Sequence, residues 1–167
     1  MVTLQKPAPR HEEQFLRAVR KSRALYKGFA SPPASVASFQ QYINSLRKEN
    51  RVGFLLTLAE SDDLVGVVNV NEIVRGSFQS AYLGYYAFLP YAGQGLMSQG
   101  MRHVIRRCFK DLKLHRLEAN IQPENERSIA LVKALGFSKE GYSPRYLKIS
   151  GRWRDHERWA ICSEEWR

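Results

Sequence analysis

Two glycines, Gly93 and Gly95, stand one residue apart between a predicted strand and a long predicted helix. Glycine lets backbone N–H groups approach a ligand closely, and a helix start adds unpaired N–H donors and the positive end of the helix dipole. The loop around Gln94 therefore predicts a cradle for a diphosphate group. The same spacing also suits a plain strand-to-helix turn. The third glycine of a dinucleotide-binding fingerprint and the Gly-Lys-Ser/Thr ending of a Walker loop are missing.

A second polar segment follows a later predicted strand and leads into another helix, from about Asn125 to Leu135. Asn125 can cap this helix, and Gly136 occupies the usual position for a C-terminal stop. Ser128 then lies in the first turn. Asn125 could serve only as a cap or could also face a ligand, and Ser128 could bond within its own helix start or act on a substrate.

The spacing of apolar residues predicts the elements that position these two segments. Helical spacing predicts one helix from about His11 to Ser22 and another after Ser35, with a break at Ser31–Ser35. After Pro90 the pattern is again strongly helical, with one apolar face and one basic face. This third helix is the one that begins at the glycine loop.

Strand-like runs occupy much of the remaining chain. Short polar turns separate the first three runs, which predicts an antiparallel meander. The predicted strands are Val52–Ala59, Leu64–Ile73, Ala81–Phe88, Arg116–Ile121, Phe137–Glu140, Arg145–Ile149 and Arg154–Ile161. The order of helices and strands predicts an α+β or mixed α/β fold on one central sheet, with residues 1–167 as a single domain.

The chain is strongly basic. Its formal net charge is +10, with +6 from residues 1–60, −2 from residues 61–101 and +6 from residues 102–167. This balance favours polyanionic partners, either nucleic acid or a phosphate-rich ligand, without choosing between them.

Composition excludes several classes of protein. With 44% hydrophobic and 25% charged residues, the chain is typical of globular proteins rather than disordered, collagen-like or coiled-coil ones. No apolar run approaches the roughly 18 residues of a membrane span, and no signal peptide is evident, which predicts a cytoplasmic protein. Cys108 and Cys162 have no metal or disulfide spacing, so we expect two reduced core residues and no metal site.

Together the two polar segments resemble the acyl-CoA site of the GNAT acetyltransferase superfamily. That site pairs a Gln/Arg-x-x-Gly-x-Gly/Ala loop with a downstream Asn-x-x-Ser helix that ends in Gly-Phe. The resemblance covers nearly the whole chain and is greatest to the RimJ/RimL branch, to RimJ-type enzymes in particular. It rests on Arg75-Gly76-Ser77-Phe78, Tyr82-Leu83-Gly84-Tyr85, Gly93-Gln94-Gly95-Leu96-Met97, His115-Arg116, Lys139-Glu140-Gly141-Tyr142 and Gly151-Arg152-Trp153-Arg154-Asp155-His156.

The resemblance implies a GNAT fold, whose central, mostly antiparallel sheet is splayed at the acyl-CoA site and flanked by helices. It also implies acetyl-CoA as co-substrate and no metal. The implied activity is acetyl transfer to the N-terminal α-amine of a protein, a ribosomal protein with N-terminal alanine in the RimJ type. The implied cofactor contacts are Phe88, Leu89, Gly93, Gln94, Gly95, Leu96, Met97, Ser98 and Asn125.

The resemblance also suggests which groups could transfer protons. In the RimL type, the serine that matches Ser128 is assigned as the acid for the departing thiolate, whereas Val132 stands where many relatives have a tyrosine. Glu118 and Glu72 are equal candidates for the base, and Leu147 stands where the RimL type has a proposed catalytic glutamate. Each glutamate could instead be a solvated carboxylate. A water-relayed base could also suffice, because an α-amine has a pKa near 7.7–8.0.

Two other functions stay open. An acetyltransferase for a small amine, such as an antibiotic or a polyamine, would want an acidic pocket, whereas residues 1–60 are net +6. A non-catalytic CoA- or RNA-binding module would fit the departures Ala92 and Val132 from the family pattern. The basic surface could contact the ribosome or its RNA. The 3′-phosphate of CoA could meet basic residues that otherwise form a solvated face, namely Arg102, Arg106, Arg107 and Arg127.

Overall fold

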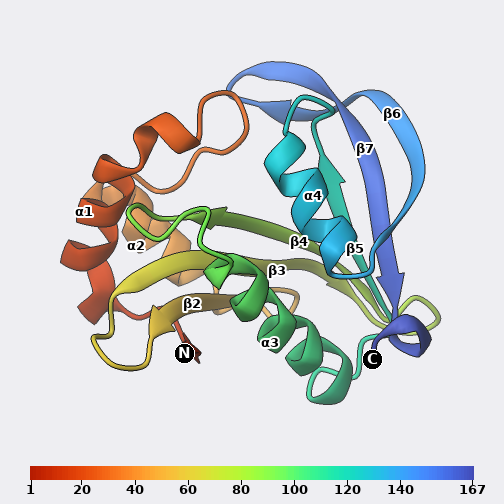
Figure 1. The fold of residues 1–167 in the computed structure, drawn as a ribbon, viewed down its shortest axis with the longest axis horizontal. Helices are drawn as coiled ribbons and strands as arrows, with labels where there is room; N and C mark the ends of the chain where they lie inside the picture. The colour runs from red at the N-terminus through yellow and green to blue at the C-terminus, as the bar shows by residue number, and fades with distance from the viewer.

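The computed structural model describes residues 1–167 and contains one seven-stranded sheet with helices on both faces (Figure 1). The predicted mixed α/β class is confirmed. Short 3-10 turns occur at Pro9–His11, Arg23–Leu25 and Ser163–Glu165. The helices and strands are, in chain order, β1 (Val2–Gln5), α1 (Glu12–Lys21), α2 (Val36–Ser45), β2 (Val52–Leu58), β3 (Leu64–Val74), β4 (Ser80–Ala87), α3 (Leu96–Lys110), β5 (Arg116–Ile121), α4 (Glu126–Ala134), β6 (Ser138–Ile149) and β7 (Arg152–Cys162).

The sheet is continuous, but two of its neighbouring strands pair over only a short part of their length. Its order is β1-β2-β3-β4-β5-β7-β6, and every neighbouring pair is antiparallel except β4 and β5. This parallel pair has only three registered positions, from Ser80 with Arg116 to Tyr82 with Glu118. Beyond them β4 continues to Ala87 and β5 to Ile121 without pairing with each other, so the two strands diverge (Figure 1). We call the space between them the β4–β5 gap.

Each face of the sheet has its own hydrophobic core. α1 and α2 pack on one face through fully buried aromatic rings such as Phe15 and Phe39. α3 and α4 pack on the other face with Met101, Ile105 and Val132. Burial of such side chains contributes roughly 1.5–3 kcal/mol each, so both helical layers are held firmly against the strands that border the gap.

β1 is a strand that the sequence analysis missed. It has four residues, of which only Val2 is fully buried, so no alternation is visible in the sequence. The strand exists because β2 supplies a partner for all four residues and the side chain of Gln99 in α3 accepts a hydrogen bond from Val2 N at 2.7 Å.

The C-terminal strands are longer than predicted. The two short strands expected around residues 137–149 are one strand, β6, paired along its length with β7. Pro144 and Arg145, which has a φ of +48°, interrupt the pattern. The register between β6 and β7 shifts here, between Ser143 and Leu147, which forms a bulge. Asp155 of β7 stabilises this bulge, because it accepts hydrogen bonds from Arg145 N at 2.8 Å and from the Tyr142 hydroxyl at 2.6 Å. The partner strand thus continues through residues that look like a loop in the sequence.

The two cysteines occupy different environments. Cys108 is fully buried in α3, and burial raises the pKa of its thiol to about 12. Cys162 is only partly buried, because it ends β7 at an end of the sheet, so the prediction of a core residue is wrong for it. Both are free thiols. None of the helices has the length and apolar character that a membrane crossing requires.

Candidate active site

The loop between β4 and α3 carries a row of unpaired backbone donors. Gly93 and Gly95 have φ values of +79° and +78°, in the left-handed region that favours glycine. The first hydrogen bond of α3 runs from Gln99 N to Gly95 O, and the N–H groups of residues 93–98 donate to no other group of the chain. Unpaired N–H groups at a helix start attract anions. The loop therefore has the geometry of the predicted diphosphate cradle.

The side chains of this loop serve its own structure. Gln94 folds back and donates to the carbonyl of Pro90 at 2.8 Å. Leu96 and Met97 pack against the core below α3. Met97 fits there because Gly66 of β3 has no side chain, and a Cβ at Gly66 would overlap the Met97 sulfur. Backbone N–H groups, rather than these side chains, are the donors that face solvent.

The predicted strand-end contacts, Phe88 and Leu89, are already engaged. Phe88 N donates to Val65 O at 2.8 Å, and Leu89 N donates to the Ser22 hydroxyl at 2.9 Å. The Phe88 ring is fully buried. Neither amide N–H is free for a pantetheine arm, because Phe88 N pairs with β3 and Leu89 N bonds to the residue that caps the end of α1.

The free backbone groups of β4 lie slightly earlier in the strand. Antiparallel ladders alternate between residues that exchange hydrogen bonds and residues whose backbone groups point away. Because Phe88 donates to β3, the backbone groups of Tyr85 and Ala87 point to the opposite edge. That edge borders the β4–β5 gap. Strand periodicity in the sequence could have indicated these two positions, but not which edge would be open.

Ser128 and Tyr85 join α4 to β4 across this gap. Their hydroxyl oxygens lie 2.6 Å apart. α4 is positioned by Asn125, whose Oδ1 accepts a hydrogen bond from Ser128 N at 3.3 Å. Burial raises the pKa of Tyr85 to about 12, and the hydrogen bond with Ser128 opposes this shift. Tyr85 therefore stays protonated at neutral pH and can donate to Ser128. The sequence analysis did not identify Tyr85 as a site residue.

Val132 lies one helical turn after Ser128 and is fully buried. Its carbonyl accepts a hydrogen bond from Phe137 N at 3.0 Å, which closes the end of α4. The side chain at this position packs in the core. A hydroxyl donor at the gap therefore comes from Ser128 and Tyr85 and not from residue 132.

Glu118 lies where β4 and β5 begin to separate. It is registered with Tyr82 in the last pair of the parallel ladder. Its neighbours Leu117 and Ala119 are buried in the core with α3 and α4, so Glu118 points to the opposite face of the sheet, as alternation predicts. Tyr82 shares that face. Burial, then Glu118 and Tyr146, raise the pKa of Tyr82 to about 12.

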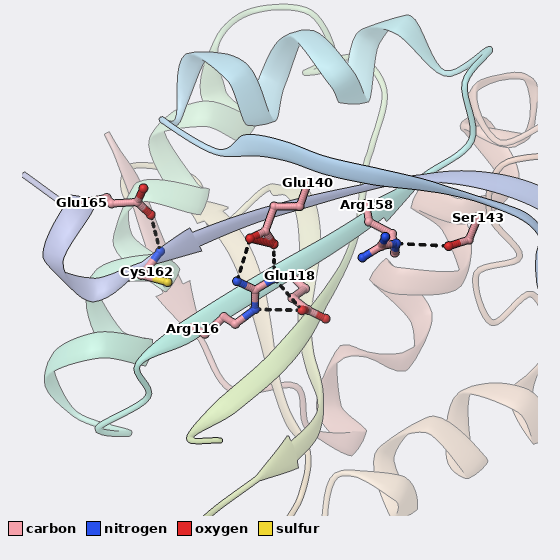
Figure 2. Close-up of polar contacts among 7 residues, drawn as sticks. All are labelled: Arg116, Glu118, Glu140, Ser143, Arg158, Cys162 and Glu165. Carbon is pink, nitrogen blue, oxygen red and sulfur yellow. Dashed lines mark hydrogen bonds and ion pairs between the residues drawn. The ribbon is translucent and has the colours of Figure 1, made fainter. Parts of the chain in front are cut away.

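Arg116 links Glu118, on its own strand β5, to Glu140 on β6 (Figure 2). Its Nε donates to Glu118 Oε1 at 2.8 Å, and its terminal nitrogens bind the carboxylate of Glu140 on β6. This hydrogen bonding by Arg116 lowers the pKa of Glu140. Figure 2 also shows Arg158 turned away, toward the Ser143 hydroxyl at 3.1 Å. One arginine thus fixes the orientation of Glu118.

Glu72 lies apart from these groups. Its side chain is exposed, its φ is +50°, and it stands at an irregularity between Asn71 and Val74 of β3. β3 is separated from β5 by the whole of β4. The structure therefore brings Ser128 and Glu118 to the two sides of the gap and leaves Glu72 outside it.

The segment between α1 and α2 borders the gap on the face that carries Glu118. Gln122, just after β5, donates from its side-chain nitrogen to Gly28 O at 2.6 Å. The hydroxyl oxygens of Ser31 and Ser150 lie 3.2 Å apart, so this segment also meets the turn between β6 and β7 (Figure 1). We call residues 26–35 the α1–α2 loop. It forms a wall beside the opening of the gap.

The four candidate phosphate-binding arginines are all exposed. Arg107 pairs with Asp111 of its own helix at 2.9 Å, and Arg102 donates to Ala134 O at 3.2 Å, which ties α3 to the end of α4. Arg106 and Arg127 make no such contact and are the freer of the four.

Comparison with known proteins gives a consistent result. Residues 2–138 match a family model described as an acetyltransferase (GNAT) domain. The probable N-acetyltransferase YjcK of Bacillus subtilis is 36% identical over 125 residues, which cover 75% of this chain and 69% of that protein. The ribosomal protein uS5-alanine N-acetyltransferase of Escherichia coli is 40% identical over 126 residues, covering 74% of this chain and 64% of that enzyme. The structure of Mycobacterium smegmatis RimJ in complex with a CoA disulfide aligns with a TM-score of 0.90 at 27% identity, over 98% of this chain and 83% of that one.

Proposed function

The chain belongs to the GNAT acetyltransferase family and is an acetyl-CoA-dependent acetyltransferase, and on that basis we propose that its acceptor is the N-terminal α-amine of a protein. A ribosomal protein with N-terminal alanine is the leading substrate, because the relative at 40% identity is named a ribosomal protein uS5-alanine N-acetyltransferase. The matched segment spans 64% of that relative's length, so the substrate is carried over as part of the proposal.

One observation carries the proposal: the candidate groups lie on opposite faces of the sheet at the same gap. Glu118 points to the α1–α2 face beside Tyr82, whereas Tyr85 and Ser128 lie on the α3–α4 side. An amine can therefore enter beside a carboxylate while the leaving group departs beside hydroxyl donors. This separation suits acyl transfer, which needs a proton acceptor on one side and a donor on the other.

In the proposed reaction the neutral amine attacks the thioester carbonyl, the C–N bond forms and the C–S bond breaks. Glu118 takes the amine proton, and Ser128 donates to the departing thiolate while Tyr85 donates to Ser128. Glu118 is favoured over Glu72 because it stands at the vertex of the gap and is oriented by Arg116 at 2.8 Å.

The residues present fit acetyl-CoA. The free N–H groups of residues 93–98 would hold the diphosphate, and the open edge of β4 at Tyr85 and Ala87 would pair with the amides of the pantetheine arm. Asn125 would act as a helix cap that sets the position of Ser128. The co-substrate supplies the activated acetyl group, and no metal is needed for this chemistry.

We further propose that residues 1–167 form a single acetyltransferase domain that acts in the cytoplasm, where a ribosomal substrate would be found. The family match ends at residue 138, but β7 pairs with β5 over six positions and so extends the same sheet. Contact of the basic surface with ribosomal RNA belongs to the same proposal.

A thiol-release assay with acetyl-CoA tests the function. Peptides beginning with Ala, Ser or Gly are compared with an N-terminally blocked peptide, a polyamine and an aminoglycoside. We expect turnover of free N-terminal peptides with Ala preferred, and none of the blocked peptide. Turnover of the small amines alone would overturn the protein acceptor while leaving the family unchanged. CoA binding without any turnover would favour a binding module.

A further inference from the structure

A cavity of about 360 Å³ lies beneath the α1–α2 loop, on the face of the sheet that carries Glu118. Its walls include Pro32 and Pro33 of the loop, Tyr42 of α2, and, on the strands or just before them, Arg51, Asn69 and Tyr86. None of its lining residues is part of the diphosphate loop or of the Ser128–Tyr85 pair. It is therefore distinct from the acyl-CoA contacts described above.

The register of β3 and β4 places this cavity close to the reacting groups. Asn69 is paired with Gly84, which lies between Tyr82 and Tyr86 on the same face of β4. Tyr82 in turn is paired with Glu118. Two residues of strand correspond to about 7 Å, and an extended peptide advances about 3.3 Å per residue. If the acceptor amine lies beside Glu118, the side chain of the second or third acceptor residue reaches this cavity.

Two buried polar atoms at the cavity have no partner. The hydroxyl oxygen of Tyr86 and Nε of Arg51 are buried and make no hydrogen bond. Tyr42 donates to Asn69 Oδ1 at 2.7 Å, which leaves the N–H groups of Asn69 to donate elsewhere. Buried polar groups are rarely left unpaired, because the loss of water is not compensated. A small rotation of Tyr86 or Arg51 toward a bound group would satisfy these atoms.

The charge of the cavity limits what it can bind. Arg51 donates to the Ser45 hydroxyl at 2.7 Å and lies 5.5 Å from the centre of the Tyr42 ring, but it forms no ion pair. The lining contains no aspartate or glutamate. A partly buried guanidinium without a counter-charge attracts a carboxylate, which can accept two hydrogen bonds from it. The same charge repels the ammonium groups of a polyamine.

We infer that this cavity binds a carboxylate side chain at the second or third position of the acceptor peptide, with Arg51 as the specificity-determining residue. The inference rests on the proposed protein acceptor and names its substrate class. Asn69 and Tyr86 contribute further hydrogen-bond donors to the same carboxylate.

The test compares peptides Ala-Xaa-Xaa that differ only in carrying Glu, Gln or Lys at the second or third position. kcat/KM is measured for each, and peptide binding to the CoA-bound protein is measured separately by fluorescence anisotropy. We expect wild-type protein to prefer Glu over Gln by about 10-fold to 100-fold, the range of a charge-assisted hydrogen bond, and to discriminate most against Lys. Arg51→Met should abolish this preference, and Arg51→Lys should keep part of it.

Arg47→Met is the matched control, because Arg47 is an exposed arginine near the end of α2 that does not line this cavity. It should retain the preference for Glu. Activity of Arg51→Met on the Gln peptide reports that the variant is folded. An unchanged Glu/Gln ratio in Arg51→Met, or no preference in wild type, would overturn the inference.

The two proposals fail separately. Acetylation of all three peptides at equal rates would support the protein acceptor and overturn the role of the cavity. Arg51-dependent binding of the Glu peptide without acetylation would support the cavity and overturn the protein acceptor.

Discussion

The side chains at the β4–β5 gap are distinguished by where the fold places them. The pKa of Tyr85 is raised by burial, so its phenol is a hydrogen-bond donor and not a base. Glu118 is held by Arg116 and faces the opposite side of the sheet. In the proposed reaction, the face that each side chain occupies decides which group can accept the amine proton and which can donate to the thiolate.

The Ser128–Tyr85 pair gives a test of cooperative action. We expect Ser128→Ala to lower kcat by about 100-fold, the lower end for loss of a general acid. Tyr85→Phe should lower kcat less, by about 10-fold, with little change in the KM for acetyl-CoA. The double variant should resemble Ser128→Ala, because Tyr85 acts through Ser128. If the fold losses in kcat of the two single variants multiply in the double variant, the two hydroxyls act independently.

Gly95 provides a test of the diphosphate cradle. A side chain at its φ of +78° is strained by roughly 1–2 kcal/mol, and the loop would shift its N–H groups to relieve this strain. We expect Gly95→Ala to weaken CoA binding by about 10-fold, equivalent to about 1.4 kcal/mol, in a calorimetric titration.

Gly76→Ala is the matched control for Gly95→Ala, because Gly76 has a φ of +66° and open space around it in the turn between β3 and β4. It should lower the melting temperature similarly and leave CoA affinity unchanged. Equal losses of CoA affinity in both variants would count against the cradle.

Among the elements, the pair β6 and β7 shows how far a partner strand can override local signals. β6 runs through Pro144 and Arg145 because β7 pairs on both sides of the irregularity. β6 is also the strand that brings Glu140 to Arg116 and so helps to orient Glu118 on β5. Glu140, which lies beyond the family match, thus supports a residue inside it.

The Arg116–Glu140 pair predicts a pH dependence of stability. The pKa of Glu140 is lower in the folded protein than its usual value of 4.5, so its contribution to stability is present above pH 4.5 and is lost as the pH falls. Because the Glu140 side chain is 41% exposed, the contribution is at most about 1 kcal/mol. In thermal unfolding, Glu140→Gln should be less stable than wild type at pH 7. The difference should shrink below pH 4.5, and a constant difference would contradict the ion pair.

For the protein as a whole, the two helical layers and the divergent strands form one opening with two sides. α3 and α4 border the side where the cofactor is proposed to bind, and the α1–α2 loop borders the other, through Gln122 and Ser150. The net charge of +10 comes from residues 1–60 and 102–167, which flank a weakly acidic middle part of the sequence. Under the proposed function, the two substrates would enter this opening from different directions.

The basic surface predicts a difference between large and small acceptors. If ribosomal RNA contacts this surface, each neutralised phosphate releases counterions and affinity falls steeply with salt. We expect the KM for a ribosomal particle to rise by about 10-fold or more between 50 and 200 mM salt, in the range described for several phosphate contacts. The KM for a short neutral peptide should change little. Equal salt dependence of both acceptors would exclude RNA contact as the cause.

The local features of this protein could be predicted from sequence because they depend on neighbours within about four residues. The positive φ values at Gly93 and Gly95, the cap made by Asn125 and the alternating faces of Leu117 and Glu118 follow from such rules. The predicted boundaries of β5, Arg116–Ile121, agree with the structure for the same reason, and the long helix predicted after Pro90 is α3.

The opening itself depends on contacts between distant parts of the chain. Register between β4 and β5 ends at Glu118, Tyr85 meets a serine 43 residues away, and the Phe88 amide is taken by β3. Strand pairing and hydrogen-bond partners of this kind are set by how helices pack on each face. Local spacing does not encode them, so the open edge of β4 and the cavity beneath the α1–α2 loop could be located only in the folded protein.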